Sequence, residues 1–173
     1  HTMDHFHERI EERENRNVLK ESARIGRGKI KALSDTNSRE LDGLILPGGL
    51  GVFKNLSNFV TAKHDFAVDK EVDQLIENIY QSKKPIGAIC GAIVLIAKSL
   101  GKKGRQLELC TSNNAYRKIL ELNHAVVKEI SSMEAYADVK NKIVTTPAFL
   151  GTQNLYEIMI GIDKMVREFA AWL

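Results

Sequence analysis

The residue with the clearest potential for chemistry is Cys90, which lies between two apolar runs. Residues 88–92 read Ala-Ile-Cys-Gly-Ala, so small residues stand two positions before and two positions after the cysteine. This is the spacing of a nucleophile elbow, a sharp strand-to-helix turn in which the two backbones pass too close for large side chains. The N–H groups that begin the following helix would favour the thiolate over the thiol. The alternative is a structural cysteine in the core, which is the usual situation of a free cysteine.

A glycine-rich segment is the second candidate for function. Residues 47–51 read Pro-Gly-Gly-Leu-Gly, and glycine lets backbone N–H groups approach a ligand closely. The segment lacks the spacing of the known phosphate-binding loops. We expect instead that the N–H groups of Gly49 and Gly91 together form an oxyanion hole. The alternative is a turn that only ends the strand before it.

The histidines do not complete a cysteine–histidine pair. His64 lies in a polar stretch and His124 between a helix and a strand, so both are expected at the surface. His5 and His7, with the glutamate that follows them, could bind a metal. A polar stretch near a chain end is more often solvated, and we therefore predict no metal site.

The elements that must position these residues alternate between strand and helix patterns. Such alternation predicts an α/β fold with a mostly parallel sheet covered by helices on both faces. The expected strands are residues 29–33, 41–46, 86–89, 107–110 and 125–130, followed by a hairpin of 135–139 and 142–145 around Lys140-Asn141. The expected helices are 15–25, 68–81, 92–97 and 113–122, and a last helix with an apolar stripe of Leu155, Ile158, Met159, Ile162, Met165, Val166 and Phe169. Residues 1–14 are expected to form a loop or the start of a solvated helix.

Ligands of parallel sheets bind beyond the carboxyl ends of the strands. The strand ends to consider are residues 47–49, 90–91 and 111–113, with 145–147 as a fourth. We therefore expect Gly48, Thr111, Ser112 and Asn113 to line a site around Cys90.

Composition bounds the class of protein. The chain has 173 residues, of which 43% are apolar and 27% charged, so one globular domain over residues 1–173 is expected. A net charge of +3 with 6% aromatic residues gives no argument for nucleic-acid binding. No apolar run reaches the roughly 20 residues of a membrane helix, and the polar start of the chain is not a signal peptide. Two cysteines, of which Cys110 is expected in the core or as a resolving thiol, favour an intracellular location, cytoplasmic or in the mitochondrial matrix.

At these residues the sequence resembles the PfpI superfamily, which has the class I glutamine-amidotransferase-like fold. The matching segments are Leu-Pro-Gly-Gly at 46–49, Lys-Asn-Leu-Ser at 54–57 and Lys-Pro-Ile-Gly-Ala-Ile-Cys at 84–90. Residues 16–25, 141–149 and 161–166 resemble its ElbB-like branch, which holds bacterial enhancing-lycopene-biosynthesis proteins and their mitochondrial relatives.

The resemblance implies a flavodoxin-like three-layer sandwich that is usually dimeric. It implies that Cys90 is the nucleophile and that the backbone of Gly49 and Gly91 holds an oxyanion. Related enzymes place an acidic residue from an early strand beside the cysteine, and this strand would lie upstream of His1. We therefore expect the opening strands of the domain to be absent. A histidine of the deglycase-like members falls at or near Ser112, whose hydroxyl is a poor general base, so peptidase or amidase activity is not expected.

The favoured function is cofactor-independent conversion of the small 2-oxoaldehydes glyoxal and methylglyoxal to hydroxy acids through Cys90, in a homodimer. Two alternatives stay open. One is a redox-responsive protein in which the Cys90 thiolate is oxidised. The other is a non-catalytic dimeric interaction protein that kept the fold.

Overall fold

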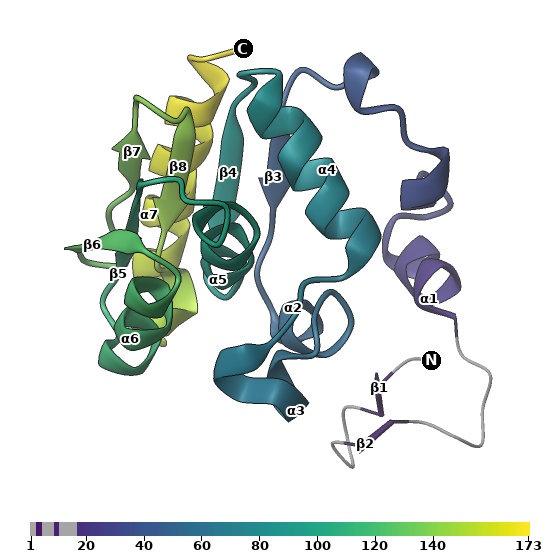
Figure 1. The fold of residues 1–173 in the computed structure, drawn as a ribbon, viewed down its shortest axis with the longest axis horizontal. Helices are drawn as coiled ribbons and strands as arrows, with labels where there is room; N and C mark the ends of the chain where they lie inside the picture. The colour runs from purple at the N-terminus through teal and green to yellow at the C-terminus, as the bar shows by residue number, and fades with distance from the viewer. Residues whose placement is uncertain (1–2, 5–8, 11–16) are drawn as a thin grey trace.

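The centre of the molecule is a four-stranded sheet with the strand order β3-β4-β8-β7 (Figure 1). The structure, a computed structural model, describes residues 3–4, 9–10 and 17–173. Strands β3 (Leu44–Leu46), β4 (Ile86–Ile89) and β8 (Ile143–Thr146) are parallel, and β7 (Tyr136–Asp138) joins β8 antiparallel. The mostly parallel sheet predicted from the sequence is therefore confirmed.

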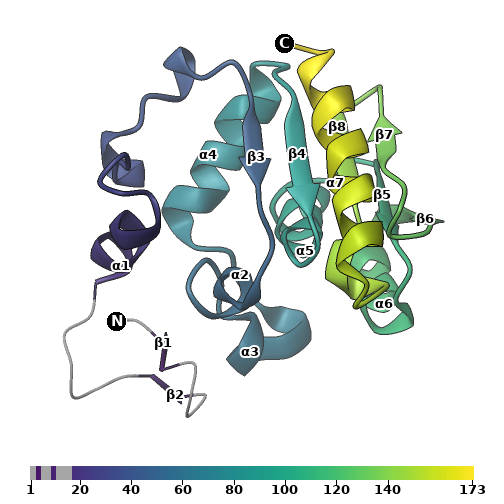
Figure 2. The ribbon, with the colours of Figure 1, turned by 180° about the vertical axis from the view of Figure 1, so that it is seen from behind.

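Helices cover both faces of this sheet. Helices α4 (Lys70–Gln81) and α5 (Ala92–Ile96) lie on one face, and α7 (Leu155–Ala170) lies on the other (Figures 1 and 2). The remaining elements are β1 (Met3–Asp4), β2 (Arg9–Ile10), α1 (Val18–Ile25), α2 (Leu50–Lys54), α3 (Phe59–Ala62), β5 (Leu107–Thr111), α6 (Asn114–Leu122) and β6 (Ala125–Glu129). The arrangement is the expected three-layer α/β sandwich.

Local sequence accounts for the helices that flank β4. Asp69 begins α4, because its carboxylate accepts hydrogen bonds from the N–H groups of Glu71 and Val72. Val72, Ile76 and Ile79 then recur at helical spacing and are buried against the sheet. Helix α5 has no polar face, and all five of its residues are buried. It continues into a π-helical turn over Ala97–Gly101. The expected buried helix after Cys90 is thus confirmed.

Strands β5 and β6 form a separate parallel pair beside β7 and β8. Side chains join this pair to the main sheet. The N–H of Cys110 donates to Oγ1 of Thr145 at 3.3 Å, and the N–H of Glu108 donates to the carboxylate of Asp138 at 2.9 Å. These two oxygens take the place of backbone acceptors at the boundary between the two sheets.

The first part of the chain differs from the sequence prediction. Residues 29–33 do not form a strand, since 29–32 lack regular structure and Leu33–Asp35 is a 3₁₀ turn. Helix α1 has no buried residue, and Val18 and Leu19, which are at helical spacing for a core-facing side, are each 39% exposed. Residues 3–4 and 9–10 pair as short antiparallel strands instead of a helix start, and the rest of 1–16 lies outside the described residues.

The second half of the chain also corrects one detail. The hairpin of β7 and β8 is present as expected, and the residue of positive φ in its turn is Lys142 (+53°). In α7, the predicted apolar stripe divides. Ile158, Met165 and Phe169 are buried, whereas Met159 is 65% exposed. Periodicity therefore located the helix correctly but overstated the width of its buried face.

No helix among the described residues is long and apolar enough to cross a lipid bilayer.

An ion-pair cluster joins α4 to the segment before β5. The guanidinium of Arg105 donates to both carboxylate oxygens of Glu77, with Nη1 to Oε2 at 2.7 Å, and Nζ of Lys103 lies 2.8 Å from Oε2. The hydrogen bond from Arg105, supported by Lys103, holds the pKa of Glu77 well below its usual value, against the opposing effect of burial.

We expect Glu77→Gln to lower the free energy of unfolding at pH 7 by about 1–2 kcal/mol, because it removes charge-assisted hydrogen bonds that are mostly shielded from water. Since the folded-state pKa of Glu77 is depressed, its contribution is present above pH 4.5 and is lost as the pH falls below that value. Urea unfolding at pH 7 and pH 3 should show a difference from the wild type that narrows in acid. The exposed Glu121→Gln variant is the control, and an equal difference at both pH values would contradict the assignment.

Candidate functional site

Cys90 lies at the turn between β4 and α5, with a φ of +57°. Its N–H donates to the carbonyl of Thr146 at 3.0 Å, and its own carbonyl accepts from the N–H of Ile93 at 3.1 Å. Cys90 is half-buried. A positive φ is rare for residues other than glycine, so the sharp turn that the spacing predicts is present in the backbone.

Close packing explains why small residues surround the cysteine. A Cβ atom on Gly48 would lie 2.6 Å from Cβ of Cys90, and one on Gly91 would lie 2.6 Å from the ring of Phe53. Ala88 and Ala92 are fully buried on the strand and helix sides of the turn. Larger side chains at these positions would push the strand, the turn and the 47–49 segment apart.

Cys90 lines a cavity of about 480 Å³ at the carboxyl ends of β3, β4 and β8. Its walls come from the 47–50 turn, Ile89, Phe53, Tyr116, residues 148–150 and Ile162. Of the four strand ends considered in the sequence, 47–49 and Cys90 line the cavity directly, and 145–147 leads into the lining residues 148–150. The lining side chains are apolar, with the exceptions of Cys90 and Tyr116.

Tyr116 is the residue of this cavity that sequence analysis did not select. Burial raises the pKa of Tyr116, and the nearby Cys90 raises it further. Its ring stacks on that of Phe53, with centroids 5.9 Å apart. Tyr116 therefore brings a phenol to the cavity that Cys90 also lines.

Residues 111–113 do not line the cavity, which corrects the prediction for Thr111, Ser112 and Asn113. Thr111 is fully buried, and Ser112 faces residue 151, where a Cβ would lie 2.0 Å from its Oγ. The side chain of Asn113 caps α6 by accepting from the N–H of Ala115 at 3.0 Å. The segment after β5 therefore contributes to the cavity only indirectly. It begins α6, whose first turn carries Tyr116.

The two glycines expected to donate to an oxyanion have different positions. Gly49 is on the cavity wall, and its φ of +100° is accessible only to glycine at low cost. Gly91 is buried beneath Phe53 and is not one of the lining residues. The role of these N–H groups in holding an oxyanion stays a prediction.

Cys110 is enclosed in the core, as expected. It is fully buried in β5, and the hydroxyl of Thr145 donates to its sulfur at 3.1 Å. Burial raises the pKa of its thiol to about 12. Within the part of the chain that the structure describes, no three histidine, cysteine or acidic side chains lie close enough together to hold a metal ion.

Three mitochondrial proteins are similar to this sequence over almost its whole length. The human glutamine amidotransferase-like class 1 domain-containing protein 3, mitochondrial, is 42% identical across 97% of this chain and 65% of its own length. The rat ES1 protein homolog, mitochondrial, is 40% identical with the same coverage, and the ES1 protein, mitochondrial, of Danio rerio is 30% identical across 96% of this chain and 67% of its own. The chain thus spans about two thirds of the length of these relatives.

Two solved structures share the fold. An isoprenoid biosynthesis protein with an amidotransferase-like domain from Ehrlichia chaffeensis matches with a TM-score of 0.84 and 28% identity, over 99% of this chain and 78% of that one. The rapid encystment protein of Francisella tularensis matches with a TM-score of 0.57 and 20% identity, over 83% of this chain and 63% of that one. The second likeness concerns the fold alone.

Packing at the elbow gives a direct test. We expect Gly48→Ala to destabilise the fold by about 1–3 kcal/mol, because the added methyl overlaps Cys90 and the carbonyl of Ile89. It should also change the rate at which iodoacetamide alkylates Cys90. Gly51→Ala is the control, since a Cβ there would lie 3.5 Å from the Asn55 side chain, which is ordinary contact. A Gly48→Ala protein with wild-type stability and alkylation rate would refute this description of the turn.

The family follows from a match that contains both parts of the site. The DJ-1/PfpI family matches residues 29–152, which include the 47–49 turn, Cys90 and Tyr116. This span is most of the chain, and the mitochondrial relatives and the Ehrlichia structure match across nearly all of it. The chain belongs to the DJ-1/PfpI family.

Proposed function

We propose that this chain carries a cysteine-dependent site that converts small 2-oxoaldehydes to 2-hydroxy acids without a cofactor. The observation that carries the proposal is the position of Cys90, at a turn of positive φ on the wall of an apolar cavity. Tyr116 supplies the other ionisable group of that cavity. Such a site offers a nucleophile and a hydrogen-bond donor in mostly apolar surroundings.

The proposed reaction balances with water as the only co-reactant. The Cys90 thiolate adds to the aldehyde carbon, which forms a C–S bond and an alkoxide that the N–H of Gly49 and the hydroxyl of Tyr116 stabilise. As the alkoxide collapses to a carbonyl, the hydrogen on this carbon moves with its electron pair to the neighbouring carbonyl carbon, whose oxygen takes up a proton. The first carbon is thereby oxidised to a thioester, and the second is reduced to an alcohol. Water cleaves the thioester, releases the 2-hydroxy acid and restores the thiol.

The cavity supports an aldehyde rather than an amide as substrate. Breaking an amide bond requires a base for the nucleophile and an acid for the leaving amine. The lining residues include no histidine and no carboxylate. An aldehyde carbon is more electrophilic and has no leaving group at the addition step. The volume of about 480 Å³ is ample for glyoxal or methylglyoxal.

The compartment and assembly form part of the same proposal. The human and rat relatives are named as mitochondrial proteins, which supports the mitochondrial matrix among the intracellular locations expected from the sequence. A homodimer and membership of the ElbB-like branch are proposed from the sequence resemblance.

We expect Cys90→Ala to reduce the formation of lactate from methylglyoxal, followed by proton NMR, to the uncatalysed rate. Tyr116→Phe should lower kcat about 100-fold, because it removes a donor to the developing alkoxide. Tyr156→Phe is the matched control, since this tyrosine is 72% exposed on α7. Turnover by Cys90→Ala at the wild-type rate would exclude the proposed mechanism.

A redox-responsive role is the second candidate, because the two thiols differ so strongly in access. Cys90 is half-buried at the cavity, whereas Cys110 is fully buried. Mild peroxide should therefore add oxygen to Cys90 and leave Cys110 as a thiol, since the thiolate is the reactive form and burial disfavours it at Cys110. Peptide mass spectrometry of wild type and Cys90→Ser measures this directly. Oxidation at Cys110 with Cys90 intact would rule the role out.

A further inference from the structure

The cavity of Cys90 is larger and more apolar than glyoxal or methylglyoxal requires. Its volume is about 480 Å³, and most of its wall consists of hydrocarbon side chains. These two aldehydes are a pair of adjacent carbonyl groups with at most one methyl group attached. Bound at Cys90, they would leave most of the apolar wall without a contact. This surplus of apolar surface points to a substrate with an apolar body.

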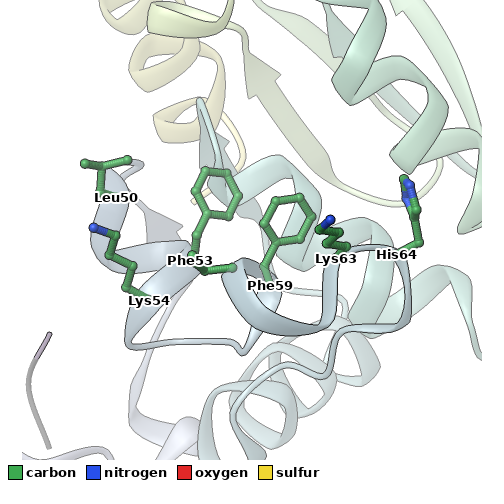
Figure 3. A pocket seen from close by; sticks show the side chains of 7 residues that line it. Leu50, Phe53, Lys54, Phe59, Lys63 and His64 are labelled. Carbon is green, nitrogen blue, oxygen red and sulfur yellow. The ribbon is translucent and has the colours of Figure 1, made fainter. Parts of the chain in front are cut away.

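One wall of the cavity is aromatic and is supported by further rings behind it. The ring of Phe53 stacks on that of Tyr116, with centroids 5.9 Å apart. Figure 3 shows Phe53 beside Phe59, and the centroids of these two rings are 4.8 Å apart. Phe59 in turn meets the buried ring of Phe66 edge-on, at 5.1 Å. Because each ring packs on the next, a flat apolar group finds this wall already formed and does not have to order it.

The other lining residues are apolar and come from several elements. Leu50 belongs to α2, Ile162 to α7 and Ile89 to the end of β4, and Phe149 follows β8. Among the described residues that line the cavity, none is a lysine, arginine, histidine, aspartate or glutamate. Such a wall favours a neutral aldehyde over the anion of a 2-hydroxy acid, which promotes release of the product.

We propose that the substrates of this site are 2-oxoaldehydes that carry an aromatic ring on the ketone carbon, of which phenylglyoxal is the simplest. This inference rests on the proposed function. The aldehyde carbon meets the Cys90 thiolate, while the ring packs on Phe53 and Tyr116 and against the aliphatic lining. The ring supplies the apolar contact that methylglyoxal lacks. The reaction is otherwise the same, and it converts phenylglyoxal and water to mandelic acid.

The fit of the ring is measured first by binding, without chemistry. The probe is 2-hydroxyacetophenone, in which an alcohol replaces the aldehyde of phenylglyoxal, so the thiol has no aldehyde to attack. Hydroxyacetone is the same replacement for methylglyoxal and differs only in carrying a methyl group in place of the ring. In NMR titrations of the whole chain, we expect the phenyl probe to bind about tenfold more tightly, because only it buries a ring on the apolar wall.

A variant that narrows the cavity shows where the ring binds. Ile162→Phe fills part of the space that the ring needs, so the preference for the phenyl probe should fall to about twofold or less. Met159→Phe is the matched control, because this position is nearly one turn earlier on α7, is 65% exposed and does not line the cavity. It should keep the wild-type preference. Leu50→Phe, at a lining position that is 58% exposed, narrows the cavity from α2 and replaces Ile162→Phe if that protein does not fold.

Turnover is the second measurement. We expect kcat/KM for phenylglyoxal, followed as mandelate, to exceed kcat/KM for methylglyoxal, followed as lactate, by about tenfold. Met159→Phe should keep this ratio, and Ile162→Phe should lower it. Because each protein is compared with itself on two substrates, a general loss of activity does not change the ratio.

The outcomes separate this inference from the proposed function. Absence of turnover of both aldehydes would overturn the proposed function and, with it, the role of aromatic aldehydes as substrates. Turnover of methylglyoxal together with equal binding of the two probes would overturn this inference alone, and so would a preference that both narrowing variants leave intact. A binding preference that is lost in Ile162→Phe, combined with faster turnover of phenylglyoxal, supports it.

Discussion

A cysteine held at a φ of +57° is disfavoured by about 1–3 kcal/mol relative to ordinary backbone, so the surrounding packing must keep it there. Three neighbours do so. The carbonyl of Thr146 accepts the N–H of Cys90 from the adjacent strand, Gly48 lies against its Cβ, and Gly91 lets the ring of Phe53 close over the turn. The strand β4, its neighbour β8 and the helix α5 therefore come together at Cys90. The same strain directs the thiol beyond the ends of the strands, where a ligand can reach it.

The cavity around the Cys90 thiol has few polar groups, so each of them matters for how a ligand binds. The cavity wall is apolar almost everywhere, so the hydroxyl of Tyr116 and the N–H of Gly49 are among the few polar groups that a ligand can meet there. A neighbouring hollow between α2 and the turn after α3 has the rings of Phe53 and Phe59 in its wall, with centroids 4.8 Å apart. Phe53 lies in both walls. A single aromatic side chain thus separates the two hollows.

Sequence patterns predict best those features that depend on interactions between residues close together in the chain. Helix α4, the hairpin and the turn at Cys90 were predictable because an N-cap, a helical period and paired small residues act within a few positions of the chain. Residues 111–113 were misplaced because β5 pairs with β6 in a separate sheet, which no local pattern records. Tyr116 was missed for the same reason, since it enters the cavity from one helical turn further along. The exposure of Val18 and Met159 was also beyond local reasoning, because periodicity identifies an apolar stripe without identifying what packs on it.

The boundary between the two sheets has a consequence for motion. Residues 107–129 are held to the main sheet by hydrogen bonds from β5 to the side chains of Thr145 and Asp138, and not by a continuous backbone ladder. Boundaries with few backbone hydrogen bonds are where proteins open as partial, cooperative units. An opening at this boundary would move α6, and Tyr116 with it, while the 47–49 turn and Cys90 would stay on the β3-β4-β8 side. The width of the cavity and the protection of amide hydrogens along β5 are then two measures of one equilibrium.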